Sequence, residues 1–187
     1  MSHQLTVRED GLAEMFSAGN KPVWHQLGQR TESAVTSAAA IRMAGLDWKV
    51  DERHLELEQS DGDRKLVHSH KAIVRRDNQH LLGVVGARYQ PIQNAEAFEW
   101  LDDLVGERRA IFETAASING GKVVRMLLEL PMALRIAGPD DVTWPYLLVC
   151  NPHHGSRAFR VLMPAVRLAC NTSPSWPLID RQGLAPR

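Results

Sequence analysis

The feature that most constrains this fold is an Asn-Gly-Gly segment at residues 119–121, which lies between two apolar runs. An Asn-Gly pair in this setting is the strongest short-range signal for a β-hairpin, because both residues tolerate the positive φ angles of a tight turn. Residues 111–118 and 122–130 are therefore predicted to be paired antiparallel strands. Pro131 has no backbone N–H to donate to a sheet, so we expect the second strand to end there.

A second strand-turn-strand pattern begins at residue 71 and is followed by a helical pattern. The turn is predicted at residues 76–79, where Asp, Asn and Gln favour turn geometry. The second strand is predicted over residues 81–89. It contains Gly83 and Gly86, and glycine inside a strand often marks a bend or the close approach of another backbone. The whole segment, through residue 105, is predicted to be a ββα unit.

Two helices are predicted from their caps and apolar spacing. Residues 31–45 are expected to form one helix, with Thr31 or Ser33 as its N-cap and Gly45 as its C-terminal stop. The second is the helix of the ββα unit. Its predicted N-cap is Asn94, and its apolar residues recur on one face.

Three further strands are predicted at residues 46–50, 144–151 and 157–170. Pro164 is expected to bulge the last of these or to place it at a sheet edge. The acidic segment 56–63 shows no metal-ligand spacing and is interpreted as the solvated end of a hairpin.

Together these patterns predict an α+β fold with a mostly antiparallel, twisted sheet, helices packed on one face and a ββα-type core. Residues 31–173 are expected to form a single α+β domain. Residues 1–30 are expected to be an N-terminal segment with a Trp-His turn, and residues 174–187 an irregular tail.

Length and composition narrow the class of protein. A chain of 187 residues can bury one proper core. Its formal net charge is zero, so any binding of nucleic acid must come from a local patch. Cys150 and Cys170 lie in apolar, strand-like contexts and are expected to be reduced and buried. Without an apolar leader or an apolar run near about eighteen residues, a cytoplasmic protein with no membrane partner is expected.

The charges are segregated along the chain. Between residues 64 and 91 there are six basic residues and one acid, whereas residues 92–107 hold five acids and no base. This pattern predicts a cationic hairpin followed by an anionic helix. Either the two elements pair with each other or are simply solvated, or the hairpin follows a phosphate backbone, which would make binding salt-dependent.

Several aromatic and histidine side chains have two interpretations. Trp24, beside His25 in a proline-led turn, can stack on a base or anchor the loop to the core. His68 and His70 share a strand face and could chelate a metal, but no third ligand is obvious, so a hydrogen-bonded or exposed pair is favoured.

No catalytic motif is present. The chain has no GxSxG, no phosphate-binding GxxxxGK and no HExxH. Cys150 with His153 or His154 could be a thiol nucleophile and base, but a buried structural thiol is favoured. We therefore expect a protein that is not an enzyme and has no cofactor and no metal.

Several segments, taken in order, closely resemble the phage/plasmid-like protein family, a domain of unknown function common on mobile elements. They are residues 23–28, 44–50, 70–105, 112–131 and 146–173. The family usually continues into a helical C-terminal part, which residues 174–187 do not resemble, so this chain is expected to lack it. The architecture also resembles that of single-strand annealing recombinases of phages.

Three functional hypotheses follow, of which the third, an enzyme with a histidine-bound metal, is the least favoured. The first is a single-stranded nucleic-acid-binding protein of recombination or maintenance, which could also form homo-oligomers. Its expected contacts are basic side chains for phosphates and aromatic side chains for stacking: Lys71, Arg75, Arg76, Arg88, Arg157, Arg160, Tyr89 and Trp24. The second is a host-interaction or anti-defence protein that docks on a host protein through its acidic helix.

Overall fold

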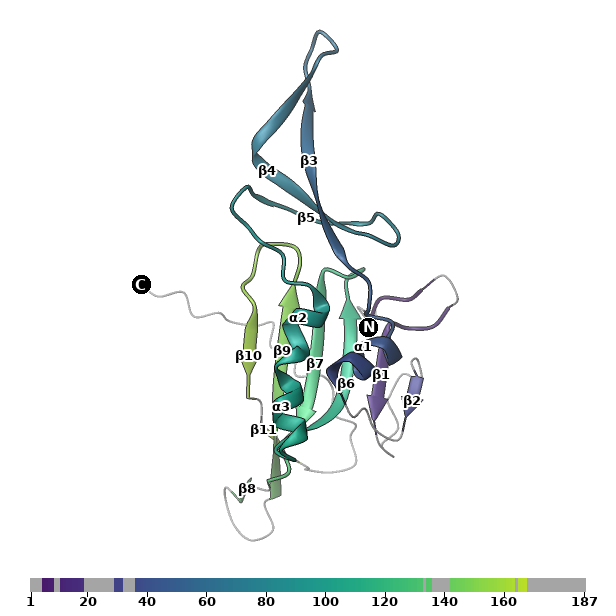
Figure 1. The fold of residues 1–187 in the computed structure, drawn as a ribbon, viewed down its shortest axis with the longest axis vertical. Helices are drawn as coiled ribbons and strands as arrows, with labels where there is room; N and C mark the ends of the chain where they lie inside the picture. Colours follow the sequence, from purple (N-terminus) through teal and green to yellow (C-terminus); the bar gives the residue numbers. More distant parts are fainter. Residues whose placement is uncertain are drawn as a thin grey trace, which may run out of the picture.

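The computed structural model of this chain describes residues 5–8, 11–18, 29–31, 36–132, 134–135, 142–163 and 165–167. These residues form two β-sheets, and short helices pack on one face of the larger sheet (Figure 1). The described strand pairs are antiparallel except for one parallel pair. The predicted α+β fold with mostly antiparallel sheets is confirmed.

The main sheet has the strand order β10-β9-β7-β6-β1-β2, and β8 and β11 also pair with β9. The parallel pair is β1 with β2. The strands are β1 (Met15–Ala18), β2 (Gln29–Thr31), β6 (Ile111–Ile118), β7 (Val123–Glu129), β8 (Leu134–Arg135), β9 (Val142–Pro152), β10 (Arg160–Leu162) and β11 (Ala165–Arg167).

The hairpin of β6 and β7 forms where the sequence predicts it. Asn119 and Gly120 adopt φ angles of +55° and +68°, which close the turn. Along β7, Val124, Met126 and Leu128 are fully buried while the residues between them are only partly buried. This alternation places every second side chain under the helices and the others on the opposite face of the sheet.

The second sheet consists of β3 (Val50–Glu58), β4 (Arg64–Arg75) and β5 (Leu81–Gly86), in that order. In Figure 1 the hairpin of β3 and β4 extends far from the main sheet, and β5 lies across its base. The β3–β4 register shifts after His54, so Leu55 faces Val67 and residues 68–70 form a bulge. We call residues 55–67, beyond this bulge, the arm. The acidic segment 56–63 lies within it, so the predicted hairpin end is confirmed.

The helices are α1 (Ser37–Met43), α2 (Asn94–Glu99) and α3 (Leu101–Gly106). α1 begins later than predicted because the hydroxyl of Thr36, rather than of Thr31 or Ser33, caps it by accepting from the Ala39 N–H. Thr31 belongs to β2 instead. The predicted stop is confirmed, since Gly45 follows the helix with a φ of +66°.

The N-cap of α2 is Gln93 and not the predicted Asn94. Asn94 is inside the first turn and 2% exposed. Its Nδ2 donates a hydrogen bond to the Leu46 carbonyl at 2.9 Å. This buried hydrogen bond fixes α2 to the segment that precedes β3. Only Val50 of the predicted strand 46–50 is in a strand.

Two other strand predictions were too long. β5 ends at Gly86, because the chain turns at residues 87–88 and the Tyr89 N–H bonds back to the Gly86 carbonyl. The strand predicted over residues 157–170 is two short strands, β10 and β11, on either side of Pro164. Cys170 lies outside the described residues.

One main core joins the two sheets and the helices. It includes Phe98 and Leu101 from the helices, Phe112 from the main sheet and Ile73 from the small sheet, all at 0% exposed. β1 of the predicted N-terminal segment lies in the main sheet between β6 and β2, and its Phe16 belongs to the same core. No residue of the arm belongs to the described core clusters.

Candidate nucleic-acid interface

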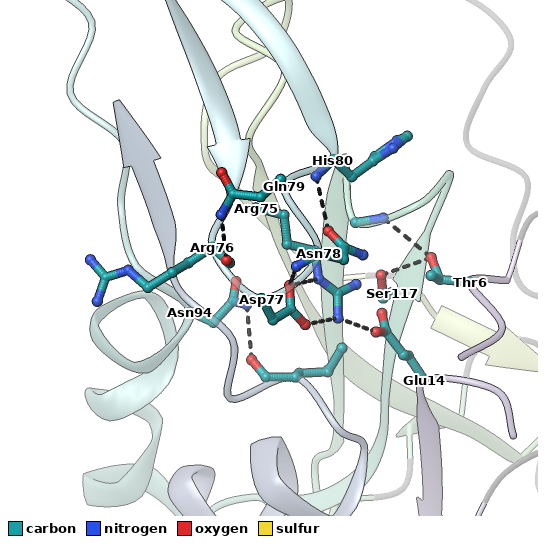
Figure 2. A network of polar contacts seen from close by, with 12 residues as sticks. Thr6, Glu14, Arg75, Arg76, Asp77, Asn78, Gln79, His80, Asn94 and Ser117 are labelled. Carbon is teal, nitrogen blue, oxygen red and sulfur yellow. Dashed lines mark hydrogen bonds and ion pairs between the residues drawn. The ribbon is translucent and has the colours of Figure 1, made fainter. Parts of the chain in front are cut away.

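Arg75, a predicted phosphate contact, is buried at the end of β4. Its side chain is 5% exposed, and its Nη2 lies 2.5 Å from the Glu14 carboxylate and 2.7 Å from that of Asp77 (Figure 2). Its guanidinium also lies 4.4 Å from the centre of the Trp48 ring, a cation–π contact. Arg75 therefore has no surface from which to contact a phosphate, and this prediction is corrected.

Two other cations of the hairpin that were predicted to contact phosphates, Lys71 and Arg76, are paired with acids of β3. The Lys71 Nζ lies 2.8 Å from the Glu52 carboxylate, and the Arg76 Nη2 lies 2.6 Å from that of Asp51. Arg76 remains exposed and points away from Arg75 in Figure 2. Its hydrogen bond with Asp51 raises the pKa of Arg76 and lowers that of Asp51, which favours the ionised pair.

The cationic hairpin is therefore largely neutralised, but not by the acidic helix. The antiparallel register brings the acids of β3 beside β4, and Glu14 approaches from β1's flank. These acids precede residue 64, so the charge imbalance of residues 64–91 does not include them. The basic side chains of the β4–β5 ribbon do not converge as a track for a polyanion.

The buried end of β4 belongs to a polar network that sequence reasoning missed. The Trp48 ring contacts both Arg75 and His153, and its centre lies 5.4 Å from the His153 ring centre. The His153 Nε2 lies 3.0 Å from the Asn94 Oδ1. Since that oxygen can only accept, Nε2 carries the proton in neutral His153. Burial lowers the pKa of His153 to about 4.

The remaining predicted nucleic-acid contacts before the arginines of the last strands are Tyr89, Arg88 and Trp24. The Tyr89 hydroxyl donates to the Pro152 carbonyl at 3.1 Å, and the ring packs against the core, so it is not free to stack on a base. Arg88 is exposed in the turn after β5 and stays a candidate. Trp24 lies outside the described residues.

Three arginines instead surround the Cys150 thiol, and we call them the arginine cluster: Arg125, Arg157 and Arg160. Arg125 on β7 and Arg160 on β10 are the two cross-strand partners of Cys150 on β9. Val124 precedes Arg125 on β7 and Val149 precedes Cys150 on β9, and both valines face the helices. Because successive side chains of a strand point to opposite faces, Arg125, Cys150 and its partner Arg160 lie on the other face of the main sheet. Arg157 comes from the connection between β9 and β10.

The charges of all three arginines act on the thiol. Burial raises the pKa of Cys150, while the positive charges of Arg125, Arg160 and Arg157 oppose that shift. Arg157 and Arg160 are exposed, and Arg125 is partly buried. Within the described part of the chain, no carboxylate pairs with Arg125 or Arg160.

Sequence reasoning predicted Arg157 and Arg160 but missed Arg125. The signal was present: Arg125 is the only charged residue among the partly buried positions of β7 before Glu129. Only the strand order and the register of β7, β9 and β10, however, show that these three side chains meet.

The thiol–histidine pair considered for Cys150 is not formed. Asn151 and His153 face α2, whereas Cys150 faces the arginine cluster on the other side of the sheet. The Nδ1 of His154 is used by Ser156, at 2.7 Å from its hydroxyl. His70 bonds to its neighbour Ser69, and the described residues contain no group of three or more side chains that could hold a metal ion.

Two carboxylates of the acidic helix have structural roles, and one of them, Glu96, accepts from the Gln93 N–H in the capping box of α2. Asp102 of α3 accepts from the backbone N–H of Ser37 at 2.5 Å and lies 2.9 Å from its hydroxyl, and so helps to cap α1. Glu99 and Asp103 are exposed. Within the described residues, no ion pair joins the hairpin to α2 or α3.

Residues 81–175 match DUF932, a domain of unknown function, and the chain belongs to this family. The match begins at β5 and includes β6, β7, β9 and β10, so it contains the arginine cluster and leaves out the arm. No curated protein and no solved structure matches the chain. Among the described residues, no helix is long and apolar enough to cross a membrane.

Proposed function

We propose that this domain binds single-stranded nucleic acid through the arginine cluster, by binding and not by catalysis. The observation that carries the proposal is the meeting of Arg125 and Arg160 at Cys150 on one sheet face, where the charge of Arg157 acts on the same thiol. Guanidinium groups are well suited to phosphates because they offer several donors in a fixed plane.

The cluster continues along the end of the main sheet. Burial lowers the pKa of the His154 imidazole, and the charges of Arg157 and Lys122 lower it further. Lys122, on the connection between β6 and β7, lies beside this segment, because its carbonyl accepts from the His153 N–H at 2.8 Å. A surface of this kind supports contact with several successive phosphates.

The spacing favours a single strand. Neighbouring β-strands lie about 4.8 Å apart, and β7 and β10 flank β9. Arg125 and Arg160 are therefore within reach of one or two nucleotides of a flexible nucleic-acid strand. The phage/plasmid-like resemblance adds a setting: recombination or maintenance of a mobile element, in which strands are exposed and annealed.

Fluorescence anisotropy with a labelled single-stranded oligonucleotide tests the proposal over a range of salt concentrations. Arg157→Ala combined with Arg160→Ala should weaken binding and lower the slope of log K against log salt by about 1.4, since each contact contributes about 0.7. Arg76→Ala is the matched control, because Arg76 is exposed but pairs with Asp51, and it should leave both values unchanged.

Absence of binding at low salt would remove the proposal. A double variant with the wild-type slope would equally show that the cluster is not the site, and loss of binding in Arg76→Ala would return the site to the hairpin.

The second candidate is docking of a host protein on the acidic helix. It is supported by the exposure of Glu99 and Asp103 and by the absence of a hairpin cation from their described contacts. A pull-down that recovers one stoichiometric protein and no DNA, and loses it with Glu99→Lys and Asp103→Lys, would favour this candidate over the first.

A further inference from the structure

The arm has two open β-sheet edges. β3 pairs only with β4 among the described strands, so its other edge is unpaired along residues 55–58. β5 pairs with residues 70–74 of β4, so the outer edge of β4 is unpaired along residues 64–67. Open edges present backbone N–H and C=O groups that can pair with another strand.

The two edges carry opposite charges. β3 contributes Glu56 and Glu58 to the arm, and β4 contributes Arg64 and Lys65. Pairing of two β3 edges would place acidic side chains beside each other, and pairing of two β4 edges would do the same with basic side chains. Like charges on adjacent strands destabilise a sheet. Pairing of β3 with β4 brings opposite charges together.

One face of the arm is largely apolar and partly exposed. Leu55 and Leu57 lie opposite Val67 and Lys65, so these four side chains share a face. Leu57 is 61% exposed. A neighbouring strand on either edge would extend this face and cover part of it.

We propose that copies of this chain assemble arm to arm, with the β3 edge of one copy paired to the β4 edge of the next. Arms that point the same way place β3 and β4 antiparallel, and Glu56 and Glu58 of one copy then lie beside Arg64 of its neighbour. A second copy is the occupant because this one hairpin carries both complementary edges. The contact is head-to-tail, so it builds a ring or a filament.

The proposal is independent of nucleic-acid binding, since the arginine cluster lies on the main sheet. Sedimentation velocity of the full chain at rising protein concentration, without nucleic acid, should show species larger than a monomer. Higher salt should shift assembly to higher concentration, because the pairing involves exposed charges.

Charge reversal supplies the decisive test. The variant Glu56→Lys with Glu58→Lys, and the separate variant Arg64→Glu, should each raise the concentration needed for assembly by about tenfold. Mixing the two variants should restore assembly, because the edges of one then complement those of the other. All three changes in one chain should also restore it, and that variant keeps the charge pairing inside the hairpin.

The matched control is Glu99→Lys with Asp103→Lys, which reverses two exposed charges on the helices and should not change assembly. A wild-type chain that stays monomeric at its highest soluble concentration would overturn the proposal. So would a mixture of the two arm variants that assembles no better than either alone, since that would show contact through other surfaces. Circular dichroism of each variant verifies that the main sheet is intact.

Discussion

At the scale of single residues, His153 is a neutral histidine held at 0% exposed between Trp48 and Asn94. Its Nδ1 has no hydrogen-bond partner within the described residues, and the Trp48 ring that it contacts also contacts Arg75. A proton on His153 would therefore add a positive charge to a site that already contains one and offers no carboxylate to Nδ1. The core requires the neutral form.

Stability should consequently fall as the pH drops. Burial lowers the pKa of His153 from 6.5 to about 4 in the folded chain, so between these values the unfolded chain binds the additional proton. The stabilisation is complete above pH 6.5 and is lost toward pH 4, with about 2 kcal/mol gone by pH 5. Urea unfolding at pH 7 and pH 5 measures it.

His70→Gln is the control for this prediction, because His70 is exposed on β4. It should keep the wild-type dependence on pH, whereas His153→Gln should flatten it. Equal pH dependence in wild type and His153→Gln would show that another group is responsible.

At the scale of elements, β5 joins the small sheet to the main sheet through Gly83. A Cβ built at this position would lie 2.7 Å from the backbone Cα and carbonyl oxygen of His154, so the glycine allows strand and loop to touch. The prediction of a close backbone approach is confirmed at Gly83. At Gly86 a Cβ would meet nothing within 4 Å, so no close backbone explains the glycine at that position.

These two glycines form a matched pair of variants. Gly83→Ala should destabilise the chain by about 2 kcal/mol, because backbone atoms cannot move aside as a flexible side chain can. Gly86→Ala should be neutral or slightly stabilising, since alanine restricts the unfolded chain. Thermal unfolding distinguishes them, and equal effects would contradict the close contact.

At the scale of the whole molecule, the arm is separable from the rest of the chain, which we call the body. The arm residues contribute nothing to the described core, and its ion pair of Arg64 with Glu56 is long, at 4.0 Å, and exposed. Exposed pairs of this kind contribute little to stability. The body should therefore fold without the arm.

Replacing residues 55–70 by Asn-Gly would join His54 through a tight turn to Lys71, its cross-strand partner. We expect an unfolding temperature close to that of the wild type, unchanged binding of single-stranded oligonucleotide and loss of self-assembly. Calorimetry, anisotropy and sedimentation measure these three properties. A large fall in unfolding temperature would mean that the arm supports the core.

The positions of the main strands could be predicted from the sequence because their signals are local. The turn at Asn119 needs only its own backbone preferences, and the alternation of Val124 with Arg125 is visible within a few residues. Boundaries were less accurate. Asn94 had a suitable residue type for an N-cap, but it lies inside the helix, where its side chain contacts the distant Leu46 carbonyl. The start of α1 and the end of β5 depend instead on local contacts, the Thr36 cap and the turn after Gly86.

What the sequence by itself determined is therefore the fold class, the hairpins and the existence of a charge imbalance. Only the tertiary structure decided which charges are available. Glu14 neutralises Arg75 although β1, β2, α1 and β3 lie between them in the chain, and the register of β3 assigns Asp51 to Arg76. Arg125 and Arg160 meet at Cys150 for the same reason: electrostatic interactions depend on distance in space, which strand order and register set and local sequence does not.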